Sequence, residues 1–299
     1  MTQGFSGQLV TKFQPILDEI YKAASVTARM DAMTKPVSFA GANVVKVFKT
    51  SLIGLGTYSR TAGYAAGDVT GTWETLTLAT ERGRELFVDR EDDEETLGMA
   101  FGTLVGEYMR TLVVPEVDAY RFSKYASWAS IQEVASPTTL SASTVLSAID
   151  TATAAMNAAE VPADGRILYV SDSVQTFLDQ SVTRMYGNDS SISTMVNRYN
   201  NMDVIMVPQT RFYKGITLDA GSGATAGGFS KTSVTGRDIN FLMVHPSAVL
   251  QVKKHDNLKI FDPDTNQDKD GWKIQYRLYH DAFVYTSKVN GVYSHIKAS

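Results

Sequence analysis

Four aspartates near the C-terminal end of the chain have the spacing that comes closest to a chemical motif. They are Asp262, Asp264, Asp268 and Asp270, and they lie just before Gly271. Acidic residues at alternate positions before a glycine resemble a calcium-binding loop, in which a hard cation takes several oxygen ligands. The position where such a loop requires a bidentate glutamate falls on Arg277, so the standard motif fails. A looser cation site and a solvated turn between two strands both stay open.

The other residues that could do chemistry have simpler structural explanations. The four histidines, His245, His255, His280 and His295, are scattered over segments that read as strands. His280 and Asp281 are neighbours in one such segment, so their side chains are expected on opposite faces and not as a catalytic pair. The acidic run 91–95 suits a helix start, where the helix dipole favours negative charge. The glycines at 221–228 precede Lys231 at the wrong spacing for a phosphate-binding loop.

The composition excludes several further classes of function. The chain has 299 residues, 43% of them hydrophobic, with 28 basic and 32 acidic side chains, so its net charge is -4. A protein that grips nucleic acid through its phosphates usually has a basic excess, which is absent here. Without cysteine there are no disulfides, thiolate metal sites or cysteine nucleophiles. No signal peptide and no membrane-length apolar run is found, so we expect a protein made in the cytoplasm without a membrane partner.

The first third of the sequence predicts a helix followed by a projecting pair of strands. Residues 15–24 have helical spacing of apolar side chains. Residues 44–49 and 73–78 read as strands, and the glycine-rich segment 54–71 between them is too long for an ordinary connection. A two-stranded finger of this kind is only marginally stable alone and needs a neighbouring chain to lie on. A third strand is expected at residues 84–89, after a turn at Gly83.

The clearest helix begins at the acidic run and carries one apolar stripe. Phe101, Leu104 and Tyr108 recur at helical spacing, so we expect them to pack against strands. Pro115 interrupts the pattern, and the helix is expected to end or kink there and then to continue to Tyr125.

The rest of the chain alternates helices and strands and then turns to strands. A helix is expected at 141–159, with Val145, Ile149 and Met156 on one face. The remaining expected elements are a strand at 166–170, a helix at 173–180, strands at 203–207 and 241–245, a flexible exposed loop at 215–237, and strands at 253–261, 272–287 and 292–296. The fold class is therefore α+β.

Several strings in this order resemble the major capsid proteins of tailed bacteriophages that infect Gram-positive hosts. They are Glu-Arg-Gly-Arg at 81–84 with Val-Asp-Arg at 88–90 and Glu-Thr at 95–96, Val-Pro-Glu-Val-Asp-Ala-Tyr-Arg at 114–121, and Trp-Lys-Ile-Gln-Tyr-Arg at 272–277 with Tyr-His-Asp-Ala-Phe-Val-Tyr at 279–285. The resemblance covers nearly the whole chain and implies the Hong Kong 97-like capsid fold. It implies an N-terminal arm with a short helix at 1–36, an extended β-hairpin (the E-loop) at 37–88, a P domain with a long spine helix at 89–135 and 246–288, and a central A domain at 136–245 and 289–299.

The resemblance also implies a function and partners. The chain would be a structural head protein that assembles as hexamers and pentamers into an icosahedral shell around double-stranded DNA, without binding that DNA specifically. The expected location is the virion, after assembly in the host cytoplasm. A separate scaffolding protein, a portal and decoration proteins are the other expected partners, since about forty residues before the finger are too few for an arm and a fused scaffold. No cofactor and no enzymatic activity are expected. A cellular nanocompartment of the same fold is the alternative, and a carboxylate hydrolase is a third hypothesis.

Intersubunit contacts are expected at two places. Candidates on the finger are Tyr58, Arg60, Tyr64 and Asp68, and candidates beside the aspartate-rich turn are Lys269 and Lys273. In the capsid fold this turn would meet its copies around local threefold axes, where basic groups or cations must offset the carboxylates. Some relatives link a finger lysine covalently to an asparagine on a neighbour, but residues 54–71 contain no lysine. Arginine is too poor a nucleophile, so a non-covalent shell is predicted.

Overall fold

A computed structural model describes residues 25–31, 43–61, 63–91, 105–181, 196–222 and 226–298. The chain divides into two compact units, Lys35–Thr80, which we call the finger, and Met1–Thr34 with Glu81–Ser299, which we call the body. The predicted helix at 15–24 and the predicted helix positions Phe101 and Leu104 lie outside the described residues. Among the described helices, none has the length and apolar character needed to cross a membrane.

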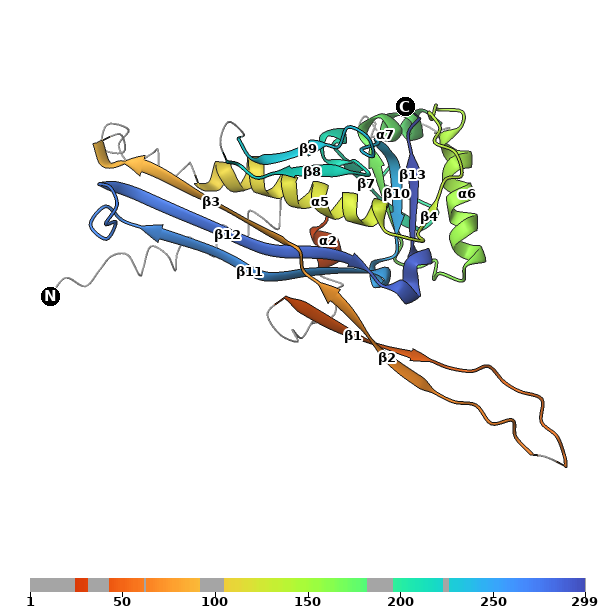
Figure 1. The fold of residues 1–299 in the computed structure, drawn as a ribbon. Helices are drawn as coiled ribbons and strands as arrows, with labels where there is room; N and C mark the ends of the chain where they lie inside the picture. The colour runs from red at the N-terminus through yellow and green to blue at the C-terminus, as the bar shows by residue number, and fades with distance from the viewer. Residues whose placement is uncertain are drawn as a thin grey trace, which may run out of the picture. The chain divides into compact units, whose positions relative to one another are not determined.

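A six-stranded sheet forms one half of the body (Figure 1). Its strands, in spatial order, are β4 (Gln132–Glu133), β13 (Val292–Ile296), β10 (Ile239–Val244), β5 (Ile167–Ser171), β7 (Met202–Val207) and β6 (Arg198–Tyr199). Strand β10 is antiparallel to β13 and β5, whereas β5 and β7 are parallel. Every residue of β5 and β10 is buried, as expected for central strands that read as continuous apolar runs.

Helices cover this sheet on both faces. Leu168 and Val170 of β5 pack in one core cluster with helices α6 (Val145–Ala158) and α7 (Asp172–Ser181). Ile167 and Tyr169 point to the other face, because side chains alternate along a strand, and they pack in a second cluster with helix α5 (Val114–Ser127). Val145, Ile149 and Met156 are all buried on α6, which confirms the predicted helix face.

A three-stranded sheet forms the other half of the body. Its order is β11 (Val249–Phe261), β12 (Gly271–Val284) and β3 (Thr80–Asp89), and β11 and β12 are long antiparallel neighbours. One face of this sheet packs against the spine helix, through a cluster that includes Met109, Val117, Ile274 and Leu278. Tyr108 is partly buried against the same cluster, which confirms its predicted position on the apolar stripe.

The spine helix passes Pro115 without ending. Residues 105–108 are helical, η1 (Met109–Val113) is a π-helical turn, and α5 follows with Pro115 in its first turn. The Val114 N–H donates to the Met109 carbonyl, five residues back, which is the π-helical spacing. Proline has no N–H to donate and is tolerated at a helix start, so α5 continues to Ser127 as expected.

Three sequence expectations for the body are wrong in detail. Residues 215–237 are not simply a loop, because β8 (Ile216–Asp219) and β9 (Gly228–Lys231) form an antiparallel hairpin there. Gly83 lies inside β3 and not in a turn before it, and a Cβ at this position would be 3.1 Å from the Tyr276 carbonyl oxygen. The strand predicted to reach residue 287 ends at Val284, and the 3₁₀ segment η4 (Thr286–Gly291) follows.

The finger is an antiparallel hairpin, as predicted. Strands β1 (Val44–Ser51) and β2 (Thr70–Thr77) pair along their whole length, from Val44 opposite Thr77 to Ser51 opposite Thr70. In the long connection that follows Ser51, the described residues form no strand, and an isolated bridge joins Ser59 and Gly63.

Candidate assembly interface

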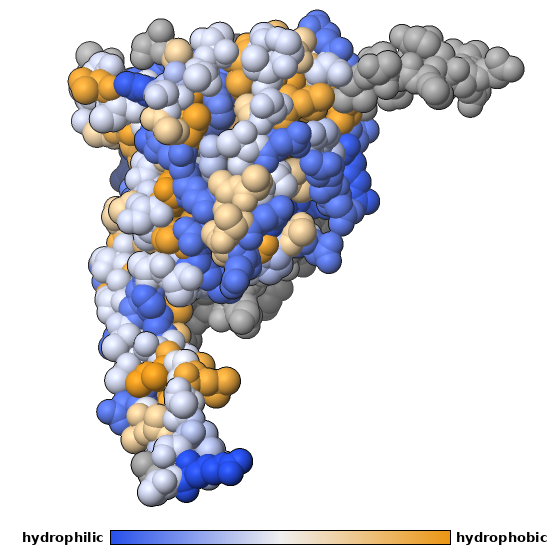
Figure 2. Space-filling view, turned by 90° about the vertical axis from the view of Figure 1, so that its right-hand side faces the viewer, coloured by the Kyte–Doolittle hydropathy of each residue, from blue (hydrophilic) through white to orange (hydrophobic). Residues whose placement is uncertain are grey.

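Most of the exposed large hydrophobic side chains of the described residues lie on the finger. Figure 2 shows an apolar patch on the finger, and further apolar areas on the body. Of twelve exposed large hydrophobic side chains, eight lie between residues 48 and 73. They are Phe48, Leu52, Ile53, Leu55, Tyr58, Tyr64, Val69 and Trp73. Single exposed apolar residues are normal on a protein surface, but a concentration of them on one element marks an interaction surface.

The connection at the end of the finger has local order. The backbones of Ser59 and Gly63 donate to each other, with N–O distances of 3.1 and 2.8 Å, and Gly63 adopts a positive φ of 82°. The rings of Tyr58 and Tyr64 lie beside this bridge with their centroids 5.0 Å apart. Arg60 is exposed between them in sequence, and Asp68 is exposed farther along. The structure therefore brings Tyr58 and Tyr64 together, and the assignment of these four residues as intersubunit contacts stays a prediction.

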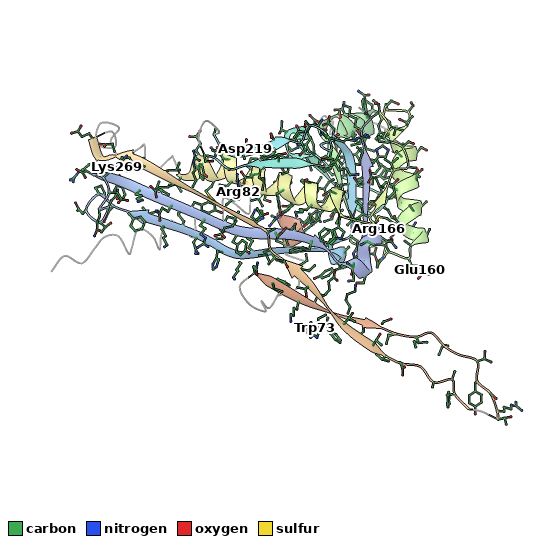
Figure 3. The ribbon with its side chains drawn as sticks, viewed as in Figure 1. Trp73, Arg82, Glu160, Arg166, Asp219 and Lys269 are labelled. Atoms are coloured by element: carbon green, nitrogen blue, oxygen red, sulfur yellow. The ribbon has the colours of Figure 1, made fainter. Side chains whose placement is uncertain are left out.

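On the body, Arg82 connects strand β3 with three other elements, α5, β8 and β9. It extends from β3 to Glu116 on α5, with an Nε–Oε1 distance of 2.6 Å, and its Nη1 donates to the Asp219 carbonyl at 2.6 Å. Its Nη2 donates to the Gly228 carbonyl at 3.2 Å. Figure 3 shows Arg82 extending from β3 toward the strand that carries Asp219. Arg82 therefore links the β8–β9 hairpin to the sheet and the helix, and Arg84 adds a hydrogen bond to the Gly221 carbonyl at 3.0 Å.

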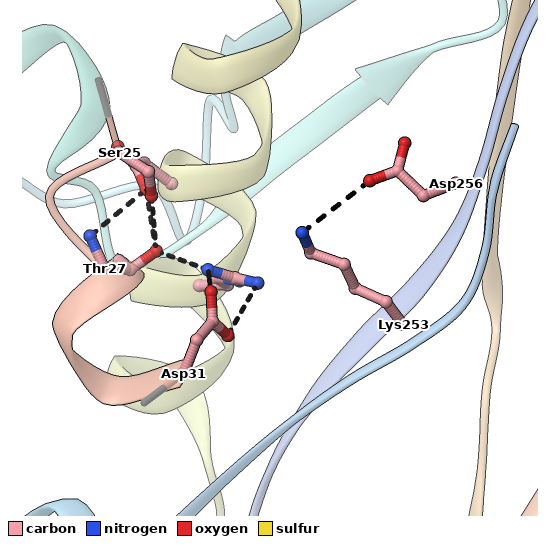
Figure 4. Close-up of polar contacts among 7 residues, drawn as sticks. Ser25, Thr27, Asp31, Lys253 and Asp256 are labelled. Atoms are coloured by element: carbon pink, nitrogen blue, oxygen red, sulfur yellow. Dashed lines mark hydrogen bonds and ion pairs between the residues drawn. The ribbon is translucent and has the colours of Figure 1, made fainter. Parts of the chain in front are cut away.

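A buried polar network holds residues 25–31 on the spine helix. Asp118, which is fully buried, accepts hydrogen bonds from the Ser25 and Thr27 hydroxyls at 2.6 and 2.7 Å and from the Val26 N–H at 3.1 Å. Arg121, also buried, donates to Thr27 and to Asp31 of the short helix α2 (Ala28–Asp31) (Figure 4). Buried charges are stable only when paired and hydrogen-bonded, and both conditions hold here.

The carboxylates of the aspartate-rich turn each have a local interaction. Asp264 and Asp270 lie 3.9 and 3.8 Å from the Arg90 guanidinium. Asp262 accepts from the Thr265 N–H at 2.9 Å. Among the described residues, no group of three or more histidine, aspartate or glutamate side chains is placed to hold a metal ion. A cation held between copies of this turn stays a prediction.

The two lysines beside the turn interact within their own chain. Lys273 Nζ lies 2.5 Å from Asp268 and 3.4 Å from Glu85, and its hydrogen bond with Asp268 raises the pKa of the lysine and lowers that of the carboxyl. Lys269 Nζ is 5.3 Å from the Phe87 ring centroid. Their role toward a neighbouring chain stays a prediction.

His280 and Asp281 do not form a catalytic pair. Asp281 accepts from the Tyr120 hydroxyl at 2.8 Å, and no described residue bonds to His280 Nδ1. Burial lowers the pKa of His280 to about 3, so this histidine is neutral at ordinary pH. Burial likewise lowers the pKa of His295 to about 4. Both histidines are buried.

Sequence reasoning missed the pair Phe48 and Trp73. These residues face each other across β1 and β2, with ring centroids 5.0 Å apart, and both are more than half exposed. The alternation of side chains in 44–49 and 73–78 could have placed them on one face of the hairpin. It could not have shown that this face is the uncovered one. Arg82, Asp118 and Arg121 were also missed, because their partners are distant in sequence.

No family model and no curated protein matches this chain. Solved structures do. A chain of Mycobacterium phage Che8 is 15% identical, with 92% of this chain and 90% of that chain covered and a TM-score of 0.58. A chain from the capsid structure of the cyanophage P-SCSP1u is 12% identical, with 88% and 86% covered and a TM-score of 0.61. A chain from the mature capsid of bacteriophage PhiM1 is 13% identical, with 86% and 83% covered and a TM-score of 0.57. The chain therefore has the α+β Hong Kong 97-like fold of tailed-phage capsid subunits.

Proposed function

We propose that this chain is the major capsid protein of a tailed bacteriophage, a non-enzymatic subunit that assembles into an icosahedral shell around double-stranded DNA. The observation that carries the proposal is the finger, which exposes eight large apolar side chains on a two-stranded hairpin and its connection. A two-stranded hairpin is marginally stable in water, so this surface calls for burial against another chain. The capsid fold supplies the context in which that other chain is a second copy.

The same proposal assigns each part of the chain to a domain of the capsid fold. Residues 1–36 would be the N-terminal arm and 37–88 the E-loop. Residues 89–135 and 246–288 would be the P domain, and 136–245 with 289–299 the A domain. Further partners would be a portal, a separate scaffolding protein and decoration proteins, with assembly in the host cytoplasm. A net charge of -4 supports a shell that encloses DNA without binding its phosphates strongly.

Removing the connection of the finger tests this function. Because Ser51 pairs with Thr70, residues 52–69 can be replaced by Asn-Gly, which closes a two-residue hairpin turn. The variant is expected to be soluble, to have the circular dichroism spectrum of the original chain, and to form no particles in electron micrographs. Normal shells from this variant would contradict the proposal. The contents of original particles, a genome or a protein cargo, separate a phage capsid from a nanocompartment.

A further inference from the structure

The two faces of the finger hairpin differ in exposure and chemistry. Lys46 and Phe48 on β1 face Thr75 and Trp73 on β2, and all four side chains are exposed. We call these four residues the aromatic face. On the opposite face Val45 and Leu76 are 1% and 6% exposed. Lys49 and Glu74 form an ion pair at 3.8 Å there, and their side chains are 33% and 13% exposed. At these positions the opposite face is thus buried or half-buried, whereas the aromatic face is exposed.

The aromatic face is ordered before any partner arrives. The Phe48 ring lies against Gly71, where an added Cβ would be 2.5 Å from the ring, and against Trp73 at an interplanar angle of 57°. Paired rings have few rotamers left to lose, so little side-chain entropy opposes binding to them. Tryptophan is also among the residues most enriched in the energetic hot spots of protein interfaces.

The charges of the finger and the body are complementary. The finger carries four basic and two acidic residues, and the rest of the chain carries 24 basic and 30 acidic ones, so the net charges are +2 and -6. Lys46, on the aromatic face, makes no ion pair with any described residue, whereas Lys49 on the other face does. A finger of one copy and the body of another therefore attract each other. Binding to nucleic acid is less favoured, since phosphate recognition requires several cations and this face has one.

We propose that a second copy of this chain docks its acidic body on the aromatic face, with Phe48 and Trp73 as the anchor and Lys46 as the steering charge. This inference rests on the proposed shell function and specifies which face of the finger makes the contact. It implies that Phe48 and Trp73 determine how much of the protein assembles, because buried aromatic anchors dominate interface energies. Lys46 determines how fast assembly proceeds at low salt, because a charge near the contact mainly changes the association rate.

Three variants of the full chain test the anchor. Phe48→Ala with Trp73→Ala is expected to reduce the particle yield, measured by sedimentation and electron microscopy, at least tenfold. Phe48→Tyr with Trp73→Tyr keeps two paired rings and should restore most of that yield, which excludes a general failure of the hairpin. The matched control, Lys49→Gln with Glu74→Gln, alters the other face and should assemble like the original chain.

The steering charge is tested by kinetics. Lys46→Glu should slow assembly, followed by light scattering, about tenfold at low ionic strength, with the difference shrinking as salt is added. The inference is overturned if the alanine pair assembles normally, if the control fails as strongly, or if Lys46→Glu only releases bound nucleic acid. Normal assembly of the alanine pair, together with failure of the 52–69 replacement, would leave the shell function standing and refute only the choice of face.

Discussion

Replacing Asp118 with alanine is expected to release residues 25–31 from the spine helix and to destabilise the body. The carboxylate is fully buried and accepts from the Ser25 and Thr27 hydroxyls and from the Val26 N–H, and Arg211 Nη1 lies 3.5 Å away. Alanine removes every one of these acceptors at once. The donors and the guanidinium are then left in a site that water reaches poorly.

The size of the effect follows from this geometry. Removing one partner of a buried ionic network costs about 3–5 kcal/mol. Each hydrogen bond to a charged group contributes about 1.5–3 kcal/mol, and the contributions do not add fully. We therefore expect Asp118→Ala to lower the free energy of unfolding by about 3–5 kcal/mol. In urea, with a slope of about 1–3 kcal/mol per molar, this moves the unfolding midpoint by about 1 M or more.

Thr27→Val is the matched comparison. Valine has nearly the shape of threonine and removes one hydroxyl that donates to Asp118 and accepts from Arg121. The expected loss is about 1–3 kcal/mol, smaller than that of Asp118→Ala. Both are measured by urea unfolding of dissociated subunits, followed by circular dichroism. A loss below about 1 kcal/mol for Asp118→Ala, or an equal loss for the two variants, would show that the carboxylate does not hold the network together.

Three further predictions follow from the body and the finger. Ile274→Ala, in the cluster under the spine helix, should cost about 2–5 kcal/mol; an unchanged melting temperature would mean that the cluster is not packed as described. His280 is neutral in the folded protein, with its pKa lowered to about 3, while the unfolded chain binds a proton below about pH 6.5. Stability should therefore fall as the pH drops from 7.5 to 5.5, by about 1.4 kcal/mol for this residue, and His280→Gln should lose that part of the dependence. Mature particles boiled in detergent should run as a single band near 32.7 kDa, because residues 54–71 contain no lysine, and a ladder would contradict the non-covalent shell.

The sequence predicted the elements that are determined by the spacing of apolar residues within a short segment. The apolar spacing on α6 predicted its buried face, and the alternation at 44–49 and 73–78 predicted the finger strands. The β8–β9 hairpin was mistaken for a loop because its glycines suggest one. Arg82 holds it on the body through hydrogen bonds to carbonyls 137 and 146 residues away. No window along the sequence contains both ends of such a contact.

Of the candidate interface, the finger was predicted from the sequence and its aromatic face was not. The finger was predicted because a long glycine-rich connection between two strands stands out, and Tyr58, Arg60 and Tyr64 on that connection stay predicted contacts. The aromatic face was not predicted, because the alternation of side chains does not show which of the two strand faces is buried. The covered face is set by Val45 and Leu76, two positions that look no different in sequence from Phe48 and Trp73.

A single finger contact, made through this face, cannot hold a shell together. Fully burying one large apolar side chain contributes about 1.5–3 kcal/mol, whereas association costs about 4–15 kcal/mol in lost freedom of motion. Phe48 and Trp73 alone therefore leave two subunits only weakly bound. In the proposed shell each copy would both offer a finger and receive one, so the contacts would become intramolecular in effect and strengthen one another. Misplaced subunits can then dissociate early, while a completed shell does not. A weak and reversible contact through the aromatic face would therefore let the proposed particle correct errors before it closes.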